Sequence, residues 1–261
     1  MAHRASDHEK AGRQRDTSAS ALTWYWHRLR CMSPSEIGYR VCQQLVSRLQ
    51  QFGLRTTRTT LKPDLSVSMS DFVSPAAGIS AQPYTNAADE ILHGRLRIFA
   101  RAYVFETSPQ WNQDPKTGTV APLSFGKRLD YRDQTVVGDI KYLWEPNRHL
   151  HLVTLAQAYH LTGDRRYLEG LRHQLESWLD QCPYLKGPNW TSSLELAIRL
   201  INWSIAWQLV GKLESPLFSD SDGKLFRDRW LSSIYQHMHF IRGHLSRFSS
   251  ANNHQIGRAH V

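Results

Sequence analysis

The stretch that most constrains the fold is residues 186–207, KGPNWTSSLELAIRLINWSIAW, which joins a short loop to a long helix. Ser192 and Glu195 have the spacing of a capping box, in which side chains satisfy free backbone N–H groups of the first turn. Apolar residues then recur every three or four positions, which is the period of one helix face. They are Leu194, Ile198, Ile201, Ile205 and Leu209. Trp203 and Trp207 widen this face, so we expect the helix to be buried on more than one side.

Glu195, Arg199 and Asn202 would lie on this helix where water is scarce, so each needs a polar partner. In one interpretation Glu195 caps the helix and pairs with Arg199 one turn later, worth about 0.2–0.5 kcal/mol on an exposed helix. In the other, both side chains meet the preceding loop on the floor of a carbohydrate-binding cleft. That loop contributes Asn189 and Trp190. Spacing alone favours the first interpretation.

The chain has 261 residues, enough for one large domain or two small ones, and 41% of them are hydrophobic. Nine Trp and ten Tyr are typical of proteins that stack sugars or bases. With 32 basic against 23 acidic residues, the formal charge of +9 favours a polyanionic partner. The three cysteines lack metal-type spacing and fit a reducing compartment better than a disulfide scaffold.

No run of the sequence is apolar for long enough to span a membrane, and the first residues lack the apolar core of a secretory signal. These features predict a cytoplasmic location. A periplasmic location is the alternative if the start of the chain is misassigned.

The amino-terminal third divides into two parts. Residues 1–20 are polar and charged and are predicted to be a disordered lead-in. Residues 21–86 are predicted to form two helices broken at Ser33-Pro34, followed by a linker rich in Thr, Ser, Pro and Gly. The spacing of Ser33 and Glu36 predicts a capping box at the start of the second helix.

The remaining chain reads as helical. A helix is predicted over 87–105, and residues 106–140 form a long loop whose aromatic residues indicate packing against a cleft. Further helices are predicted to start near Pro146, after Asp164 and near residue 225, in addition to the helix after Ser192. The last of these would place Trp230, Ile234, Met238 and Ile241 inside. Short turns between helices predict an all-α array of antiparallel hairpins.

Two polar clusters stand out. Residues 144–149, WEPNRH, would open one helix, where Arg148 and His149 oppose the helix dipole. They are either a solvated first turn or an anion-binding group. The second cluster, Asn252-Asn253-His254, is either a simple turn or a functional motif. His237 and His239 sit two residues apart on a predicted helix, so their side chains diverge and a metal site is not expected.

Four blocks together resemble the amino-terminal helical domain of the heparinase II/III-like polysaccharide lyases. They are WNQDPKTG at 111–118, KYLWEPNRHLHLVTLAQAYHLTGDRRY at 141–167, GPNWTSSLELAIRLINW at 187–203 and LSRFSSANNH at 245–254. Their order and spacing agree with the family from about residue 85 to residue 256. Several motifs in the right order make the resemblance much more specific than any one of them.

The resemblance implies an incomplete (α/α) toroid over 87–255, normally followed by an antiparallel β-sandwich domain. It implies β-elimination of an acidic, uronate-containing polysaccharide, without a cofactor and without a nucleic-acid partner. In the family the Asn-His of the last motif serves at the substrate carboxylate, which assigns that role to Asn253 and His254. The Asn-Trp loop and the Trp-Glu-x-x-Arg-His segment would line the cleft. The cleft residues are then Asn189, Trp190, Glu195, Arg199, Trp144, Glu145, Arg148 and His149.

The end of the chain departs from the family pattern. The catalytic Tyr of the family lies downstream of the Asn-Asn-His motif, and this sequence stops seven residues after His254. Residues 256–261, IGRAHV, match one reading frame of a common sequencing adapter. We hypothesise that this tail is adapter-derived and that the natural protein is longer, so we expect this chain alone to be inactive.

Two other functions remain open from the sequence. An α/α-toroid glycoside hydrolase would use two carboxylates, with Glu145 and Glu195 as candidates roughly 5–10 Å apart across a cleft. A basic helical module would bind an anionic glycan or nucleic acid without turnover. Ultraviolet absorbance of an unsaturated uronate product distinguishes a lyase from both.

Overall fold

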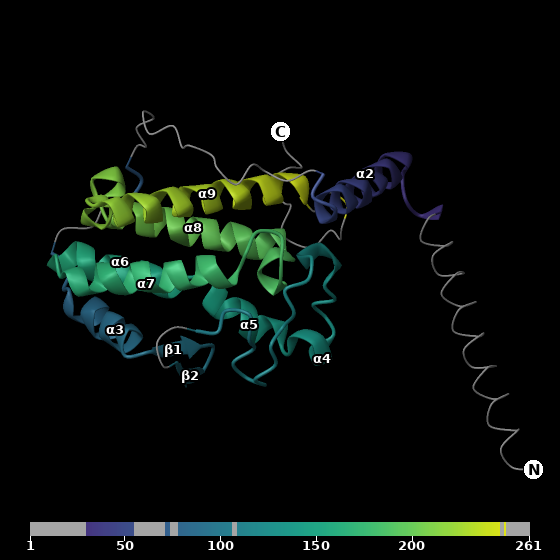
Figure 1. The fold of residues 1–261 in the computed structure, drawn as a ribbon. Helices are drawn as coiled ribbons and strands as arrows, with labels where there is room; N and C mark the ends of the chain where they lie inside the picture. Colours follow the sequence, from purple (N-terminus) through teal and green to yellow (C-terminus); the bar gives the residue numbers. More distant parts are fainter. Residues whose placement is uncertain (1–29, 55–70, 74–77, 106–108, 246–247, 249–261) are drawn as a thin grey trace, which may run out of the picture. The chain divides into compact units, whose positions relative to one another are not determined.

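The computed structural model describes residues 30–54, 71–73, 78–105, 109–245 and 248 (Figure 1). The chain divides into two compact units, one of residues 1–55 with 246–261 and one of residues 56–245. In the smaller unit, α2 (Pro34–Gln51) begins after Ser33, whose hydroxyl accepts a hydrogen bond from the Glu36 N–H. This confirms the predicted helix start. The Glu36 carboxylate pairs with Arg40 one turn later.

In the larger unit the first described helix is α3 (Gln82–Leu92). An antiparallel hairpin of β1 (Arg95–Ile98) and β2 (Arg101–Val104) follows it. The helix predicted over 87–105 is therefore wrong in its second half. Gly94 ends the helical run with a φ of +75°, and a Cβ there would lie 2.0 Å from the Phe105 carbonyl oxygen. After it, burial alternates along β1, with Leu96 and Ile98 inside, which is the period of a strand.

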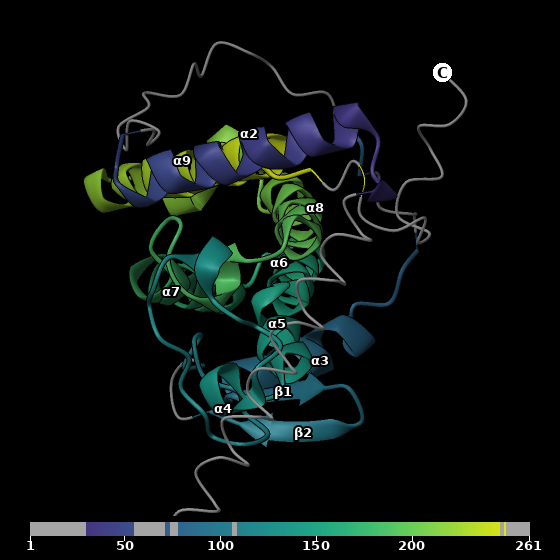
Figure 2. The same cartoon turned by 90° about the vertical axis from the view of Figure 1, so that its right-hand side faces the viewer.

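The other described elements of this unit are helices joined by loops, which confirms the all-α class. The longer helices are α5 (Ile140–Asn147), α6 (Leu150–Thr162), α7 (Arg165–Gln181), α8 (Ser193–Leu209) and α9 (Ser221–Gly243). The short ones are α4 (Gln134–Val137), η1 (Gly126–Arg128), η2 (Pro188–Trp190), η3 (Lys212–Glu214) and η4 (Pro216–Phe218). α6 lies between α3 and α8, α9 follows α8, and α7 packs against both α6 and α9 (Figures 1 and 2).

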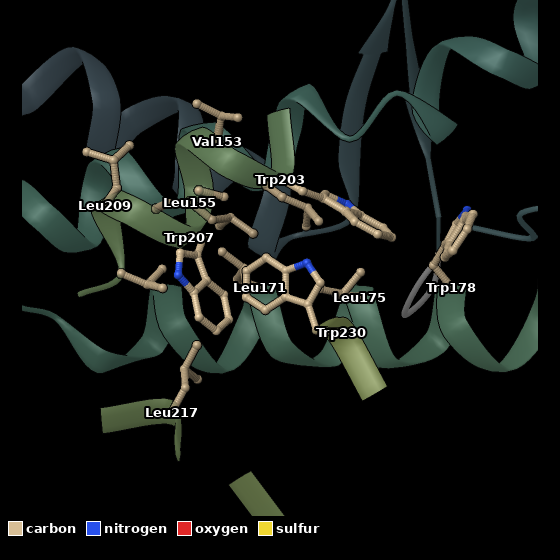
Figure 3. Packing of buried hydrophobic residues seen from close by; sticks show 14 of the residues in the cluster. Val153, Leu155, Leu171, Leu175, Trp178, Trp203, Trp207, Leu209, Leu217 and Trp230 are labelled. Atoms are coloured by element: carbon tan, nitrogen blue, oxygen red, sulfur yellow. The ribbon is translucent and has the colours of Figure 1, made fainter. Parts of the chain in front are cut away.

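A cluster of tryptophans joins α7, α8 and α9 (Figure 3). Trp203 meets Trp178 and Trp230 edge to face, with ring centroids 5.5 and 6.5 Å apart. Trp207 packs edge to face on Trp230 at 5.1 Å. Such pairs add to the burial of apolar area because the positive edge of one ring faces the negative face of another.

The buried surface of α8 is only partly the predicted one. Trp203, Trp207 and Leu209 are buried as expected, and so are Glu195 and Arg199. Leu194 and Ile201, which were predicted to face the core, are 44% and 59% exposed. The helix is rotated so that its tryptophans, which remove the most apolar area from water, face the core. Arg199 and Glu195, one and two turns before Trp203, lie on the same side of the helix and are therefore buried too.

Two further details of the helix predictions are corrected. α9 starts at Ser221, after an Asp220 cap, and places Trp230 inside but leaves Met238 56% exposed. The predicted capping box of α8 does not form, because the Ser192 side chain makes no capping hydrogen bond. The start of α7 is as predicted, since the Asp164 carboxylate accepts from the Arg166 N–H.

The long loop before α5 is packed, as predicted, and Asp114 organises it. Trp111 is buried, and so is the Asp114 carboxylate. This carboxylate accepts hydrogen bonds from the Lys116 N–H, the Thr117 hydroxyl and the Asp139 N–H. It thereby ties the loop to the start of α5, the helix that leads into the candidate site.

Gly138, between α4 and α5, tests this arrangement. Its φ of +71° and ψ of −152° lie in a region that only glycine adopts readily, and a Cβ would lie 2.5 Å from Asp114 Oδ2. We expect Gly138→Ala to lower the free energy of unfolding by about 3 kcal/mol, measured by urea denaturation. Gly163→Ala is the matched control, because Gly163 has a φ of +72° with open space around it, and should cost only about 1 kcal/mol. Equal losses would show that the contact with Asp114 contributes nothing.

Candidate functional site

The candidate site is built around the elbow between α5 and α6. Pro146 lies in the last turn of α5 and not near a helix start, which corrects the prediction that residues 144–149 open a helix. Arg148 is the C-cap of α5, where a positive charge is favoured by the helix dipole rather than opposed by it. His149 has a left-handed φ of 62° and is the N-cap of α6, which makes the elbow sharp.

Arg148 joins the elbow to α8. Its guanidinium donates to both carboxylate oxygens of Glu195, with Nε–Oε2 at 2.8 Å and Nη2–Oε1 at 3.1 Å, and to Glu145 at 2.6 Å. Asn202 donates its side-chain amide to the Arg148 carbonyl. The hydrogen bond with Glu195 raises the pKa of Arg148. Glu195 therefore pairs across helices with Arg148, and not with Arg199 on its own helix as the first interpretation expected.

Arg199 is fully buried at the centre of the helical array. Its Nε donates to the Asn147 carbonyl, its Nη1 lies 2.9 Å from His237 Nε2, and its guanidinium stacks 4.5 Å from the Trp178 ring. Because His237 Nδ1 lies 2.7 Å from the Ser233 carbonyl, it carries the proton and leaves Nε2 as an acceptor for Arg199. Burial lowers the pKa of Arg199 to about 10, which still leaves it charged at neutral pH.

The imidazoles of His149 and His151 are buried beside this group. The Trp203 indole N–H donates to His149 Nδ1 at 2.8 Å, and Trp111 stacks on His151. Burial lowers the pKa of His149 well below its ordinary value and that of His151 to about 3, so both are neutral. The side chain of His151 interacts with Gln174, whereas the Nε2 atom of His149 makes no hydrogen bond to any residue that the structure describes.

Hydrogen bonds from buried side chains to backbone carbonyls fix the loop before α8. The buried Asn189 donates its amide to the Trp111 carbonyl at 3.1 Å, and the Trp190 indole donates to the Cys182 carbonyl. The Trp144 indole donates to the Pro188 carbonyl, which fastens α5 to η2. The structure thus brings the eight predicted cleft residues together around the starts of α6 and α8. Most of them are buried.

The structure does not test the predicted role of the Asn-Asn-His motif. Asn253 and His254 lie outside the described residues. The role that the resemblance assigns to them at the substrate carboxylate remains a prediction.

Sequence reasoning missed a second polar group, near the end of α9. The Lys127 ammonium donates to the Thr191 carbonyl at 3.1 Å, and Tyr184 Oη lies 2.9 Å from His239 Nδ1. Desolvation lowers the pKa of Lys127 and brings that of His244 to about 4. The sequence gives only a weak indication of this group, because Lys127 and Tyr184 come from loops that are far apart along the chain. His237 and His239 do diverge, as predicted, toward Arg199 and Tyr184.

The chemistry available here is that of cations, amides and imidazoles. Among the residues that the structure describes, no group of three or more His, Cys, Asp or Glu could hold a metal ion. No helix in the described part of the chain is long and apolar enough to cross a membrane. Positive side chains at helix ends suit a ligand that carries negative charge.

A family model described as the heparinase II/III N-terminus matches residues 39–260. The chain belongs to the heparinase II/III family. The resemblance seen in the sequence is thereby confirmed, and the polysaccharide lyases of this family make a polysaccharide the expected substrate class. None of the curated proteins and none of the solved structures that were compared matches the chain.

Removing Arg148 should destabilise this heparinase-family chain, because Glu195 would keep its buried charge without a partner. We expect Arg148→Ala to cost about 2–3 kcal/mol of unfolding free energy in urea titrations, less than a fully buried pair because Arg148 is partly exposed. The double variant Arg148→Ala with Glu195→Gln should recover part of this loss. Arg166→Ala, which breaks the exposed pair with Asp164, is the control and should cost under about 1 kcal/mol. A loss from Arg148→Ala no larger than the control would contradict the assignment.

The buried imidazoles predict acid-sensitive stability. The pKa values of His149, His151 and His237 are all lowered on folding, so the unfolded chain binds more protons below about pH 6.5. Their contribution is fully present above that pH and is lost as the pH falls toward the folded-state values. Each group should steepen the loss by up to about 1.4 kcal/mol per pH unit.

This dependence can be measured by urea unfolding between pH 7 and pH 5. His151→Phe removes one of the three groups and should reduce the slope by about one proton's share. Asn86→Ala, at an exposed position on α3, removes no titratable group and is the control that should leave the slope as it is in the parent. A slope that is the same in all three proteins would contradict the prediction.

Proposed function

We propose that this chain is the helical part of a lyase that cleaves uronic-acid-containing glycans, of the heparan sulfate or alginate kind, by β-elimination. The observation that carries the proposal is the family match over residues 39–260. The excess of 32 basic over 23 acidic residues supports an acidic polymer as substrate.

The reaction sets three tasks. The C5 carboxylate must be neutralised so that the C5 proton becomes acidic, a base must remove that proton, and an acid must protonate the departing O4. In our proposal Asn253 and His254 donate hydrogen bonds to the carboxylate and stabilise the enolate that develops as the proton leaves. A Tyr or His within hydrogen-bond reach transfers the protons.

The described residues support the binding of an acidic chain at the ends of α6, α8 and α9. Arg148 keeps its charge and is partly exposed, with side-chain exposure of 32%. Lys127 is exposed as a residue, but its ammonium is partly desolvated and donates to a backbone carbonyl, so a substrate carboxylate would give the charge a stronger partner. In the sequence the Asn-Asn-His motif follows α9, which carries His239 near its end and His244 as its C-cap. We infer that the buried residues Asn189, Trp190 and Arg199 position these groups.

A hydrolase is less well supported. Glu145 and Glu195 bind the same Arg148 guanidinium, and both oxygens of Glu195 are engaged there. A general acid must hold a proton and deliver it to the leaving oxygen, and a carboxylate saturated by a guanidinium is poorly suited to that task.

The test is to recover the full-length gene and assay its product against heparan sulfate, alginate and other uronate polymers. We expect new ultraviolet absorbance from unsaturated uronate ends. Asn253→Ala and His254→Ala should each lower the rate by roughly a hundredfold or more, because each removes a donor to the developing enolate. Asn86→Ala and His93→Ala are matched controls that delete the same side-chain types from exposed positions, and should leave the rate unchanged.

The other outcomes are equally specific. New reducing ends without absorbance, lost in Glu195→Ala, would replace the lyase with a hydrolase. Binding of a uronate polymer without any turnover by the full-length protein would replace it with a glycan-binding module.

A further inference from the structure

A row of apolar side chains along one side of α8 is partly open to solvent. Leu194, Ile198, Ile201 and Ile205 follow one another every three or four residues, which is the period of one helix face. Leu194 and Ile201 are 44% and 59% exposed, and Ile198 and Ile205 are half-buried. Apolar residues exposed singly are ordinary, whereas a contiguous apolar patch marks an interaction surface. We call these four residues the α8 stripe.

The α8 stripe is separate from the candidate site. Glu195, Arg199 and Trp203 are buried on the same helix. At about 100° per residue, they lie roughly 100–180° around the helix axis from Leu194. A ligand at the candidate site therefore leaves the stripe exposed, and another partner is needed to remove its apolar surface from water.

The chain contains a segment with a complementary pattern. Residues 61–70, LKPDLSVSMS, alternate strictly between apolar and polar side chains. The apolar ones are Leu61, Pro63, Leu65, Val67 and Met69. In an extended chain every second side chain points to the same side, so this sequence has one apolar edge and one polar edge. Such alternation predicts a segment that is half-buried against another element.

The described chain continues from this segment at the end of the α8 stripe. Residues 55–70 lie outside the described ranges. Immediately after them, the Phe72 N–H donates to Gln208 Oε1 at 3.2 Å, and Asp71 pairs with Lys212 at 2.6 Å. Gln208 follows Ile205 by less than one turn and continues the line of the stripe. The segment is therefore attached where the stripe ends.

The lengths of the segment and the stripe agree. From Phe72 back to Leu65 an extended chain covers about 23 Å, and from Gln208 back to Leu194 the helix covers about 21 Å. An antiparallel run from the Phe72–Gln208 contact therefore reaches the whole stripe. In this register Val67 lies near Ile198.

We propose that residues 61–69 dock along the α8 stripe, antiparallel to the helix, with their apolar edge on the stripe and their polar edge in water. Because they are joined to the end of α8 through Asp71 and Phe72, they compete for the stripe at a high effective concentration, which a separate molecule lacks. The helix that carries Glu195 and Arg199 is then packed on both sides, by the candidate site and by the amino-terminal part of the larger unit.

Disulfide trapping in the 261-residue chain tests this docking. The exposed Cys31 and Cys42 are first replaced by serine, and the buried Cys182 stays in place. One cysteine is then introduced in the segment and one on α8 or α9, and crosslinking under mild oxidation is followed by electrophoresis without a reducing agent.

The alternation of the segment supplies the matched control. Val67→Cys should form an intrachain disulfide with Ile198→Cys at least about tenfold faster than Ser68→Cys does, because only the apolar edge brings the two sulfurs within bonding distance. Leu225, 62% exposed on α9, lies outside the stripe. Val67→Cys with Leu225→Cys should therefore crosslink no faster than the Ser68→Cys pair.

A second readout measures whether the stripe is covered. Ile201→Cys, introduced alone, reports through its rate of reaction with a maleimide. Leu65→Asp with Val67→Asp should raise this rate about tenfold or more, because carboxylates on the apolar edge cannot be buried against the stripe without a partner. Ser66→Asp with Ser68→Asp places the same charges on the polar edge and should leave the rate unchanged.

Three outcomes would overturn the proposal. The first is equal crosslinking of Val67→Cys and Ser68→Cys to Ile198→Cys. The second is a reactivity of Ile201→Cys that both pairs of aspartates leave unchanged. The third is crosslinking of Ile198→Cys between two chains, which would assign the stripe to a second copy of the protein.

Discussion

A guanidinium with no access to water lies at the centre of the larger unit, and the surrounding elements are arranged to satisfy it. A charge in such a place is very costly unless hydrogen bonds and polarisable groups replace its hydration. Arg199 obtains these from three directions, namely the Asn147 carbonyl at the end of α5, His237 on α9 and the Trp178 ring on α7. Three helices are thus placed around α8 by a requirement that apolar packing alone would not impose, since apolar contacts carry little directional preference.

The same requirement shapes the elbow that forms the site. Asn147 can offer its carbonyl to Arg199 only where α5 has ended, and His149 must then take a left-handed conformation to start α6. Arg148, between them, points its side chain to Glu195 on α8 and its carbonyl to Asn202. α8 therefore holds the elbow at three points. Glu195 binds the Arg148 side chain, Asn202 binds the Arg148 carbonyl, and Arg199 binds the Asn147 carbonyl. The geometry of the site therefore follows from the hydrogen bonds that the buried Arg199 requires.

The sequence predicted the parts of this arrangement that depend on local signals. The Asp164 cap, the Ser33 cap and the all-α class were right, because each depends on residues within a few positions of one another. The burial of Trp203 was predicted, but Leu194 and Ile201 were wrongly placed inside, because counting apolar residues gives them the same weight as a tryptophan. The hairpin was missed because Gly94 and an alternation of only four residues define it. The partner of Glu195 lies 47 positions away, beyond any local pattern.

The burial of most candidate residues divides the site into two kinds of group. Asn189, Trp190 and Arg199 have almost no exposed surface, so in the proposed function they would act only through the groups they hold in place. The groups that can meet a polymer are at the rim, and among the described residues they include the cations Arg148 and Lys127. The inner acidic residue, Glu195, is neutralised by a partner and does not oppose them. In the proposed function, cations at the rim would attract a polyanion, while the chemistry would depend on the few donors aimed at one carboxylate.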